Sequence, residues 1–380
     1  MLQSILDKFH AVASDPKAQK DKYLKEGKKI VLVSYYTPEE IIHSMGAVPF
    51  GVWGGDLQLQ DAKQYFPAFI CSIVQSIVEL GIKGTYEGAS AIVFPSLCDS
   101  LKVVGENWKY AVPSIKFVPM TYPQNRKPDF GHDFTRAGYE RVIADVSEAT
   151  GLTFDEEKLD VSLAVYNEHN RVMRELVPVL ADHPEITNQQ RSDIFKSAFF
   201  MIKEEHTALV KELIHALEAD GGVCRKEQEA AKAAGKHRIL TTGILCDAPD
   251  LLQILDENGM QIVCDDVAAE SRQYCVDAPD EGSPLERLVE KFCSMDNDTL
   301  LCDVEKKRVG RIVEMARAAK ADGVLAVMTK FCDPEEFDYP LIRKACLAAD
   351  LPILNIEVDR QMVDYGQART AIETFRDLME

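Results

Sequence analysis

Two apolar segments that each lead into a Cys-Asp dipeptide constrain the fold of this chain most strongly. One is Gly323–Met328 in ADGVLAVMTKFCDPEEFDYP, where Cys332 follows the apolar run, and the other is Ala91–Phe94 in GASAIVFPSLCDSLK, where Cys98 follows. Short, continuous apolar runs are typical of parallel strands that are buried on both faces. Open α/β folds bind ligands beyond the carboxyl ends of such strands. Both thiols are therefore expected at a ligand-binding edge of a sheet.

Strands and helices alternate in both halves of the chain. The expected strands are 29–34, 48–53, 91–94 and 114–120 in the first half and 238–245, 261–264, 323–328 and 352–358 in the second. This alternation predicts parallel, doubly wound sheets. Because a strand in each half leads into Cys-Asp, the halves resemble a diverged duplication. The expected fold class is α/β, with two doubly wound parallel-sheet units of the flavodoxin or Rossmann type plus a helical segment.

The length of 380 residues favours two or three domains. We expect an N-terminal α/β domain over 1–135 that carries Cys71 and Cys98, and a C-terminal α/β domain over 236–380 that carries Cys332. Between them, 136–235 contains LAVYNEHNRVMRELVPVLAD and SAFFMIKEEHTALVKELIHALEAD, whose apolar spacing is that of amphipathic helices. The segment EQEAAKAAGK is expected to end a helix or to act as a linker.

The charge and hydropathy of the chain exclude several classes of protein. A formal net charge of -19 argues against a nucleic-acid binder, which needs a basic surface. No apolar run approaches the roughly 18–20 residues of a membrane span, and the N-terminus is polar and amphipathic, unlike a secretory signal. We therefore expect a cytoplasmic protein that does not cross a membrane. The 10 cysteines of such a chain are not a disulfide framework.

Three cysteines stand where a thiolate is favoured. Cys98 and Cys332 follow strands, and Cys71 lies in the first turn of a helix expected over 67–80. Backbone N–H groups at helix N-termini and in such turns favour thiolate over thiol. Thiolates are the ligands that iron–sulfur clusters and zinc require. The wide spacing matches neither CxxC zinc modules nor ferredoxin runs, so partly buried turn cysteines without a ligand remain the alternative.

The other cysteines and the histidines give weaker signals. Cys246 ends a strand and precedes an aspartate, so it is a candidate fourth ligand. His169 and His206 occupy polar positions on helices, which indicates solvated surface. The remaining cysteines divide into three expected in the core (Cys264, Cys302 and Cys346) and three in polar stretches without a visible partner (Cys224, Cys275 and Cys293).

No familiar catalytic or phosphate-binding motif is present. The chain contains no Ser-His-Asp pattern, no P-loop and no GxGxxG. A loose basic stretch in the first half is interpreted as a solvated face rather than a site for the phosphates of a nucleotide-bearing ligand. Its members are Lys102, Lys109, Lys116, Arg126 and Lys127.

Several separated blocks together resemble the 2-hydroxyacyl-CoA dehydratase family over nearly the whole chain. They are YYTPEEIIHSMGAVPFGVWGG, YFPAFICSIVQSIVELGIKG, PSLCDSLKVVGENWKYAVP, the CDD at 264–266 with ESRQ at 270–273, and MTKFCDPEEFDYPLIRK. The GVWGG and KFCDPEEFDYP blocks most resemble the β subunit. The resemblance implies a heterodimer with a homologous α subunit, an ATP-dependent iron–sulfur activator protein, and a 2-hydroxyacyl-CoA substrate held mainly on the α subunit.

The resemblance also implies a cofactor and a reaction. One 4Fe–4S cluster per chain would be held by Cys71, Cys98 and Cys332, with no cysteine of this chain expected on the fourth iron, so Cys246 is a departure. Removing water from a 2-hydroxyacyl thioester takes a β-proton that the carbonyl does not acidify. General acid–base catalysis supplies only about 10²–10⁴-fold. One electron added to the thioester carbonyl gives a ketyl radical that expels the hydroxyl group, and this subunit's cluster would relay that electron.

Two other functions stay open, as do two local interpretations. The chain also suits a benzoyl-CoA reductase-type subunit, or a non-catalytic α/β ligand-binding protein whose cysteines are merely buried. Asp99, Asp333 and Glu335, beside the expected ligands, are interpreted as helix caps or as acceptors near the cluster. Trp53, Tyr65 and Phe66 are candidates for contact with the α subunit, with core packing as the alternative.

Overall fold

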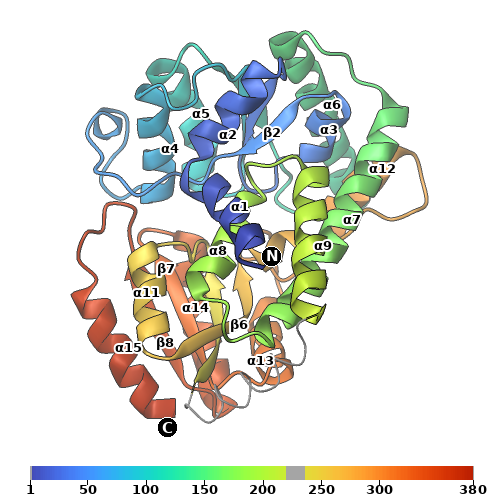
Figure 1. Ribbon diagram of the computed structural model, residues 1–380. Coiled ribbons are helices and arrows are strands. Elements are labelled where there is room, and N and C mark those ends of the chain that lie inside the picture. Colours follow the sequence, from blue (N-terminus) through green and yellow to red (C-terminus); the bar gives the residue numbers. More distant parts are fainter. Residues whose placement is uncertain (1, 220–235, 380) are drawn as a thin grey trace.

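The computed structural model describes residues 2–219 and 236–379 and contains two four-stranded, entirely parallel sheets. The first sheet has the strand order β2-β1-β3-β4 and the second β6-β5-β7-β8. Counted within each unit, both orders read 2-1-3-4. The α/β fold with two doubly wound units and a helical segment is therefore confirmed. Figure 1 shows the first unit (blue and cyan) above the second (yellow to red), with α7 and α9 running along one side.

The element bounds follow the expected alternation. The strands are β1 (Ile30–Val33), β2 (Val48–Gly51), β3 (Ala91–Pro95), β4 (Lys116–Met120), β5 (His237–Gly243), β6 (Met260–Val267), β7 (Gly323–Thr329) and β8 (Ile353–Val358). The helices are α1 (Leu2–Ser14), α2 (Pro16–Lys25), α3 (Glu39–Ser44), α4 (Ser72–Ile82), α5 (Asp99–Ala111), α6 (Asp129–Thr150), α7 (Glu156–Ala181), α8 (Asn188–Ser197), α9 (Lys203–Ala219), α11 (Pro249–Glu257), α12 (Pro284–Ser294), α13 (Lys307–Ala318), α14 (Asp333–Ala348) and α15 (Gly366–Met379). Cys224 and nearly all of EQEAAKAAGK lie outside the described residues. Within the described ranges, no helix is long and apolar enough to cross a bilayer.

The two strands that lead into Cys-Asp lie inside their sheets. Strand β3 pairs with β1 and β4, and β7 pairs with β5 and β8. Every residue of β3 and of β7 is buried, because neighbouring strands and helices cover both faces. Their continuous apolar runs thus have a direct physical cause, and both strands end at the carboxyl edge of their sheet.

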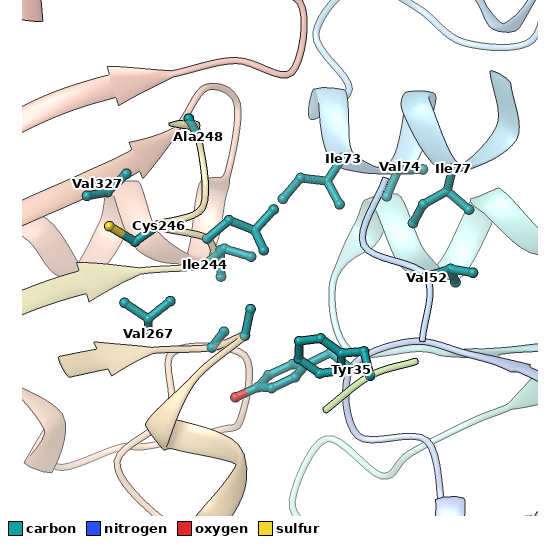
Figure 2. Packing of buried hydrophobic residues seen from close by; sticks show 14 of the residues in the cluster. Tyr35, Val52, Ile73, Val74, Ile77, Ile244, Cys246, Ala248, Val267 and Val327 are labelled. Atoms are coloured by element: carbon teal, nitrogen blue, oxygen red, sulfur yellow. The ribbon is translucent and has the colours of Figure 1, made fainter. Parts of the chain in front are cut away.

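One hydrophobic core joins the two units. Helix α4 of the first unit contributes Ile73, Val74 and Ile77 to a cluster that also contains Ile244, which follows β5 of the second unit. Figure 2 shows Ile73 and Ile244 on facing sides of the boundary between the two units. Burying one aliphatic side chain of this size contributes roughly 1.5–3 kcal/mol. The shared core therefore fixes the N-terminus of α4 against the carboxyl edge of the second sheet.

Packing also joins parts of the chain that are expected to belong to different domains. Helix α12 comes from the second half of the chain, but Leu288 and Phe292 of α12 lie in the core of the first sheet. The Phe292 ring stacks on Tyr122 with 3.9 Å between ring centroids. Helix α1, in turn, packs on α8 and α9. The boundaries near 135 and 235 stay predictions, and the first unit draws part of its core from beyond residue 280.

Gly243, at the end of β5, allows the close approach of β7. Its φ is +148°, and a Cβ placed there would lie 2.2 Å from the carbonyl oxygen of Val327. We expect Gly243→Ala to destabilise the protein by roughly 2–4 kcal/mol, because backbone atoms of both strands must move apart. Thermal and urea unfolding followed by circular dichroism measure this change.

Gly310 is the matched control, since it lies inside helix α13 and a Cβ there meets nothing within 4 Å. Gly310→Ala should leave stability unchanged or raise it by about 0.5–1 kcal/mol. Equal effects of the two substitutions would contradict the packing assigned to Gly243.

Candidate functional site

Three cysteines occupy the N-cap positions of three helices. Cys71 precedes α4, Cys98 precedes α5 and Cys332 precedes α14. All three are free and half-buried. The first N–H groups of a helix have no partner inside the helix, so each thiol stands beside unpaired donors and the positive end of the helix dipole. The sequence predicted these residues at helix starts and strand ends, and the structure agrees.

The three thiols lie close enough for their charges to interact. Burial, above all, raises the pKa of Cys332 well above its usual range, and the Glu335 carboxylate and the Cys71 and Cys98 thiols add to the rise. Burial likewise raises the pKa of Cys98 to about 11, with a further contribution from Cys71. Thiols from both units therefore lie within electrostatic reach of one another.

Backbone and hydroxyl donors oppose this effect of burial. The N–H groups of Val74 and Ile73 and the hydroxyl group of Ser100 lower the pKa of Cys71, although burial still raises it overall. Without a cation the buried thiols stay protonated at neutral pH. A metal that replaces their protons would turn them into thiolates, and the surrounding donors suit that form.

The remaining cysteines lie elsewhere. Cys246, the candidate fourth ligand, is 2% exposed and belongs to the shared core. Figure 2 shows its sulfur atom beside Val327. Cys264 and Cys346 are in the core of the second unit, as expected, whereas Cys302 is only half-buried. Cys275 is exposed, and Cys293, assigned to a polar stretch, is instead buried in the core of the first sheet.

Glu335 does not cap α14 but forms a buried ion network. It accepts hydrogen bonds from Arg308 at 2.8 Å and Arg272 at 3.0 Å, and Arg308 also donates to Asp266 of β6 at 2.8 Å. These groups are nearly inaccessible to solvent. The network ties the first turn of α14, and with it Cys332, to β6 and to α13. Asp99 and Asp333, by contrast, are exposed to solvent.

The residue before Cys332 has an unusual backbone conformation. Phe331 has a φ of +65°, which a bulky L-residue rarely adopts. Such conformations cost about 1–3 kcal/mol and persist where the surroundings enforce them, frequently at functional sites. The strain therefore coincides with the turn that presents the Cys332 thiol.

Arg360, in the turn after β8, connects the two units next to Cys71. Its guanidinium group contacts Asp56 of the first unit and Asp247 of the second, both at 2.9 Å. Its backbone N–H donates to Ser72 Oγ at 3.0 Å, one residue after Cys71. The guanidinium group also binds the carbonyl oxygen of Trp53 at 3.2 Å. Arg360 is thus a buried cation that fixes the start of α4 against the second sheet, and no local pattern in the sequence indicates it.

The prediction that His169 and His206 are solvated is wrong. Their exposed fractions are 1% and 0%, and they contact each other because α7 packs against α9. The helical spacing of the sequence could have indicated that His169 is buried. His169 follows Tyr166 by three residues and precedes Met173 by four, and both of those are buried on the same face of α7.

The basic stretch of the first half is paired within the chain. Lys116 binds Glu148 at 2.6 Å, and Lys127 binds Asp296 at 2.9 Å. Arg126, expected on a solvated face, is instead buried and donates to the carbonyl oxygens of Met295 and Cys302. Lys102 and Lys109 bind acidic neighbours on their own helix.

The aromatic residues around the thiols divide into core and surface. Trp53 packs against Phe199 with 5.1 Å between ring centroids, and Phe66 is buried, so both contribute to the core. The exposed side chains are instead those that flank the cysteines in sequence. Phe69 is 68% exposed and Phe337 is 77% exposed, and Phe331 is also exposed. These three residues, called the apolar rim below, expose apolar surface within five sequence positions of Cys71 or Cys332.

Comparison with known proteins adds a family to this geometry. Residues 34–379 match the family model "2-hydroxyglutaryl-CoA dehydratase, D-component". The (R)-phenyllactyl-CoA dehydratase beta subunit of Clostridium sporogenes is 41% identical over 98% of this chain and 97% of its own. The lactoyl-CoA dehydratase subunit beta of Anaerotignum propionicum is 37% identical over 100% and 99%. A benzoyl-CoA reductase subunit of Thauera aromatica is more distant, with 23% identity over 92% and 90%.

The pairing of Arg360 with Asp247 predicts a specific pH dependence. Burial works to raise the pKa of Asp247, but Arg360 and Lys196 outweigh it and hold the pKa at about 2. An unfolded aspartate has a pKa near 3.9, so the folded protein gains about 2 kcal/mol above pH 4 and loses it as the pH falls toward 2. Asp247→Asn should therefore destabilise the protein at neutral pH, and its difference from wild type should shrink between about pH 5 and pH 3.

Unfolding of both proteins across this pH range tests the prediction. Asp377→Asn is the control, since Asp377 is an exposed partner of Arg376 and its loss should change stability by less than about 0.5 kcal/mol. A difference for Asp247→Asn that stays constant down to pH 3 would contradict the assigned ion pair.

Proposed function

Because the chain belongs to the 2-hydroxyglutaryl-CoA dehydratase D-component family, we propose that it is the β subunit of a radical dehydratase that converts a 2-hydroxyacyl-CoA into a 2-enoyl-CoA and water. In this proposal Cys71, Cys98 and Cys332 hold a 4Fe–4S cluster. The observation that carries the proposal is that three thiols from two units, each at the N-cap position of a helix, lie within electrostatic reach of one another.

The donor set fits a cluster better than a single ion. Among the described residues, no three His, Cys, Asp or Glu side chains are placed to bind one metal ion. The thiolates of a cluster bind different iron atoms, so they need not converge on one point. The three thiols are partly accessible, which leaves a path for loading, and they lie in a mostly buried site that suits a redox group. Because Cys246 is enclosed in the core, the fourth iron is left without a cysteine from this chain.

The chain's own residues define the environment of this group. A bound cluster would supply one-electron transfer, which acid–base groups alone cannot provide. Arg272 and Arg308 neutralise the Glu335 carboxylate next to Cys332, and they also pair with the buried carboxylates of Asp266, Asp298 and Asp338, so this network adds no net positive charge beside the thiol. The helix N-termini at all three thiols would favour the reduced, more negative state of a cluster, because the positive end of each helix dipole lies beside a thiol.

The apolar rim supports a permanent partner. Exposed phenylalanines on both sides of the thiol site are costly in water and are typical of a covered interface. Two of the relatives above are named as β subunits, which supports a homologous α subunit as the occupant. We place the substrate mainly on that α subunit, and an ATP-dependent iron–sulfur activator as the electron donor. The complex would work in the cytoplasm.

A second candidate is a subunit of a benzoyl-CoA reductase-type enzyme. The distant relative from Thauera aromatica supports it, but at lower identity than the dehydratase subunits. The two reactions differ in their products, because dehydration releases water without net reduction. Mass spectrometry of the CoA esters formed by the complete complex separates them.

The ligand assignment predicts the effect of removing each thiol. We expect Cys71→Ala, Cys98→Ala and Cys332→Ala each to lose most of the bound iron and the visible absorbance, with far-UV circular dichroism retained. The loss follows because a cluster held by three thiolates cannot keep its geometry with two. Iron and acid-labile sulfide are counted on protein purified without oxygen.

Cys264→Ala and Cys346→Ala are matched controls, since both thiols are buried in the core of the second unit. They should retain their iron and lose only stability. Full iron content in any one of the three ligand variants would exclude that residue from the set.

The partner proposal predicts that the chain is inactive alone and associates through the apolar rim. Phe337→Glu should weaken binding to the α subunit by at least about tenfold, because a charge would be buried at an apolar contact. Leu378→Glu is the control, since Leu378 is 70% exposed near the C-terminus of α15, at the far end of the second unit in Figure 1.

Anaerobic co-purification and sedimentation measure the association, and dehydration is assayed with activator and ATP. Unchanged binding by Phe337→Glu would place the interface elsewhere. Full turnover by this chain without the α subunit would show that the complete active site is here.

A further inference from the structure

A polar cavity of about 70 Å³ is lined by none of the three cysteines Cys71, Cys98 and Cys332. It is found beyond the carboxyl ends of β1 and β4, where Tyr36 and Tyr122 line it, and α7 and α12 form other walls. Doubly wound folds bind small molecules at this edge of a sheet. Tyr36 and Glu39 are only half-buried, so the cavity is not completely enclosed.

The charged groups of the cavity balance one another. Glu39 binds Lys203 at 3.3 Å, and Glu40 binds Lys291 at 2.6 Å. Two carboxylates and two ammonium groups leave no net charge in the wall. A charged ligand would break one of these pairs, so the cavity suits a neutral one.

A chain of hydrogen bonds defines the protonation of His169, which lines the cavity. His206 Nε2 lies 3.0 Å from the carbonyl oxygen of Ile194, which can only accept, so this nitrogen carries the hydrogen. Burial lowers the pKa of His206 to about 3 and that of His169 well below its usual range, so both rings are neutral. His206 Nδ1 therefore accepts from His169 Nε2 at 3.0 Å, and His169 Nδ1 is left as an acceptor.

Three lining side chains have buried polar atoms that remain unpaired. Within the part of the chain that the structure describes, no hydrogen-bond partner is found for His169 Nδ1, Gln273 Nε2 or Tyr274 Oη. Tyr274 is 4% exposed. Unpaired buried groups are costly, and several around one cavity indicate a missing partner. The set contains an acceptor on histidine, a donor on the amide and a hydroxyl group that can do either.

We propose that this cavity binds a small neutral molecule in which a hydroxyl group stands beside a carbonyl group. The ligand hydroxyl donates to His169 Nδ1, and the ligand carbonyl accepts from Gln273 Nε2 and Tyr274 Oη. The volume matches about two water molecules of roughly 30 Å³ each, so the hydroxyl, the carbonyl and the carbon between them fill it. Any larger substituent extends past Tyr36 and Glu39.

None of the three thiols lines this site, and its existence does not depend on the proposed function. The head of a 2-hydroxyacyl thioester carries the same pair of groups, and that correspondence alone rests on the proposed function. The site can therefore be tested without iron, partner or coenzyme A.

Glycolamide is the probe, because it is neutral and has a hydroxyl group next to a carbonyl group. Calorimetric titration of the full chain compares it with acetamide, which lacks the hydroxyl, and with glycolate, which is an anion. Glycolamide should bind at least about fivefold more tightly than either, as expected for one added hydrogen bond or one avoided buried charge. A crystal structure with glycolamide should show it between His169 and Gln273.

Tyr274→Phe should weaken glycolamide binding by about fivefold, because only the hydroxyl group is lost. Tyr23→Phe is the matched control, since Tyr23 is buried outside the cavity and its hydroxyl group already binds Glu205 at 2.9 Å. Equal binding of glycolamide and acetamide by the wild-type protein would overturn the proposal. So would a glycolamide-soaked crystal in which the cavity holds only water.

Discussion

The arrangement of the thiol site depends on one buried cation, Arg360. It is held between Asp56 of the first unit and Asp247 of the second, while its backbone binds Ser72 at the start of α4. Removing one partner of a buried ion pair leaves an uncompensated charge, typically at a cost of about 3–5 kcal/mol. The shared hydrophobic core stabilises the contact between the two units, but apolar contacts are not directional. The ion pairs select one relative position of the two sheets.

A second group of buried charges fixes the position of α14, the helix that begins at Cys332. Arg308 and Arg272 bind Glu335 and Asp266, and so connect the first turn of α14 with β6. The thiols of Cys71 and Cys332 are therefore each held one helical turn or less from a guanidinium–carboxylate network. An apolar core of equal volume would bury these helices as well, but it would define their N-terminal positions less sharply.

Local patterns in the sequence predict the strands and their ends, because a strand that is buried on both faces consists of consecutive apolar residues. The run at Gly323–Met328 is continuous since both faces of β7 are covered, and the Cys-Asp turn after it marks the edge. Arg360, by contrast, acts through residues about 110 and 300 positions away in the chain, and nothing near it indicates those partners. His169 lies on an apolar stripe, but only the packing of α7 on α9 explains why an imidazole is buried there. Periodicity identifies the buried face of an element and leaves its neighbour undetermined.

The position of α12 has a consequence for the order of events during synthesis. The core of the first sheet is incomplete until Leu288 and Phe292 leave the ribosome, and the start of α4 is not fixed until Arg360 does. Ribosomes add roughly 5–20 residues per second, so the first unit waits roughly 7–30 seconds for the part of the chain that completes its core. During that interval Cys71 and Cys98 have been synthesised, but Cys332 and the rest of the second unit that covers them have not. The three thiols can therefore take up their final positions only after the chain has been made through Arg360.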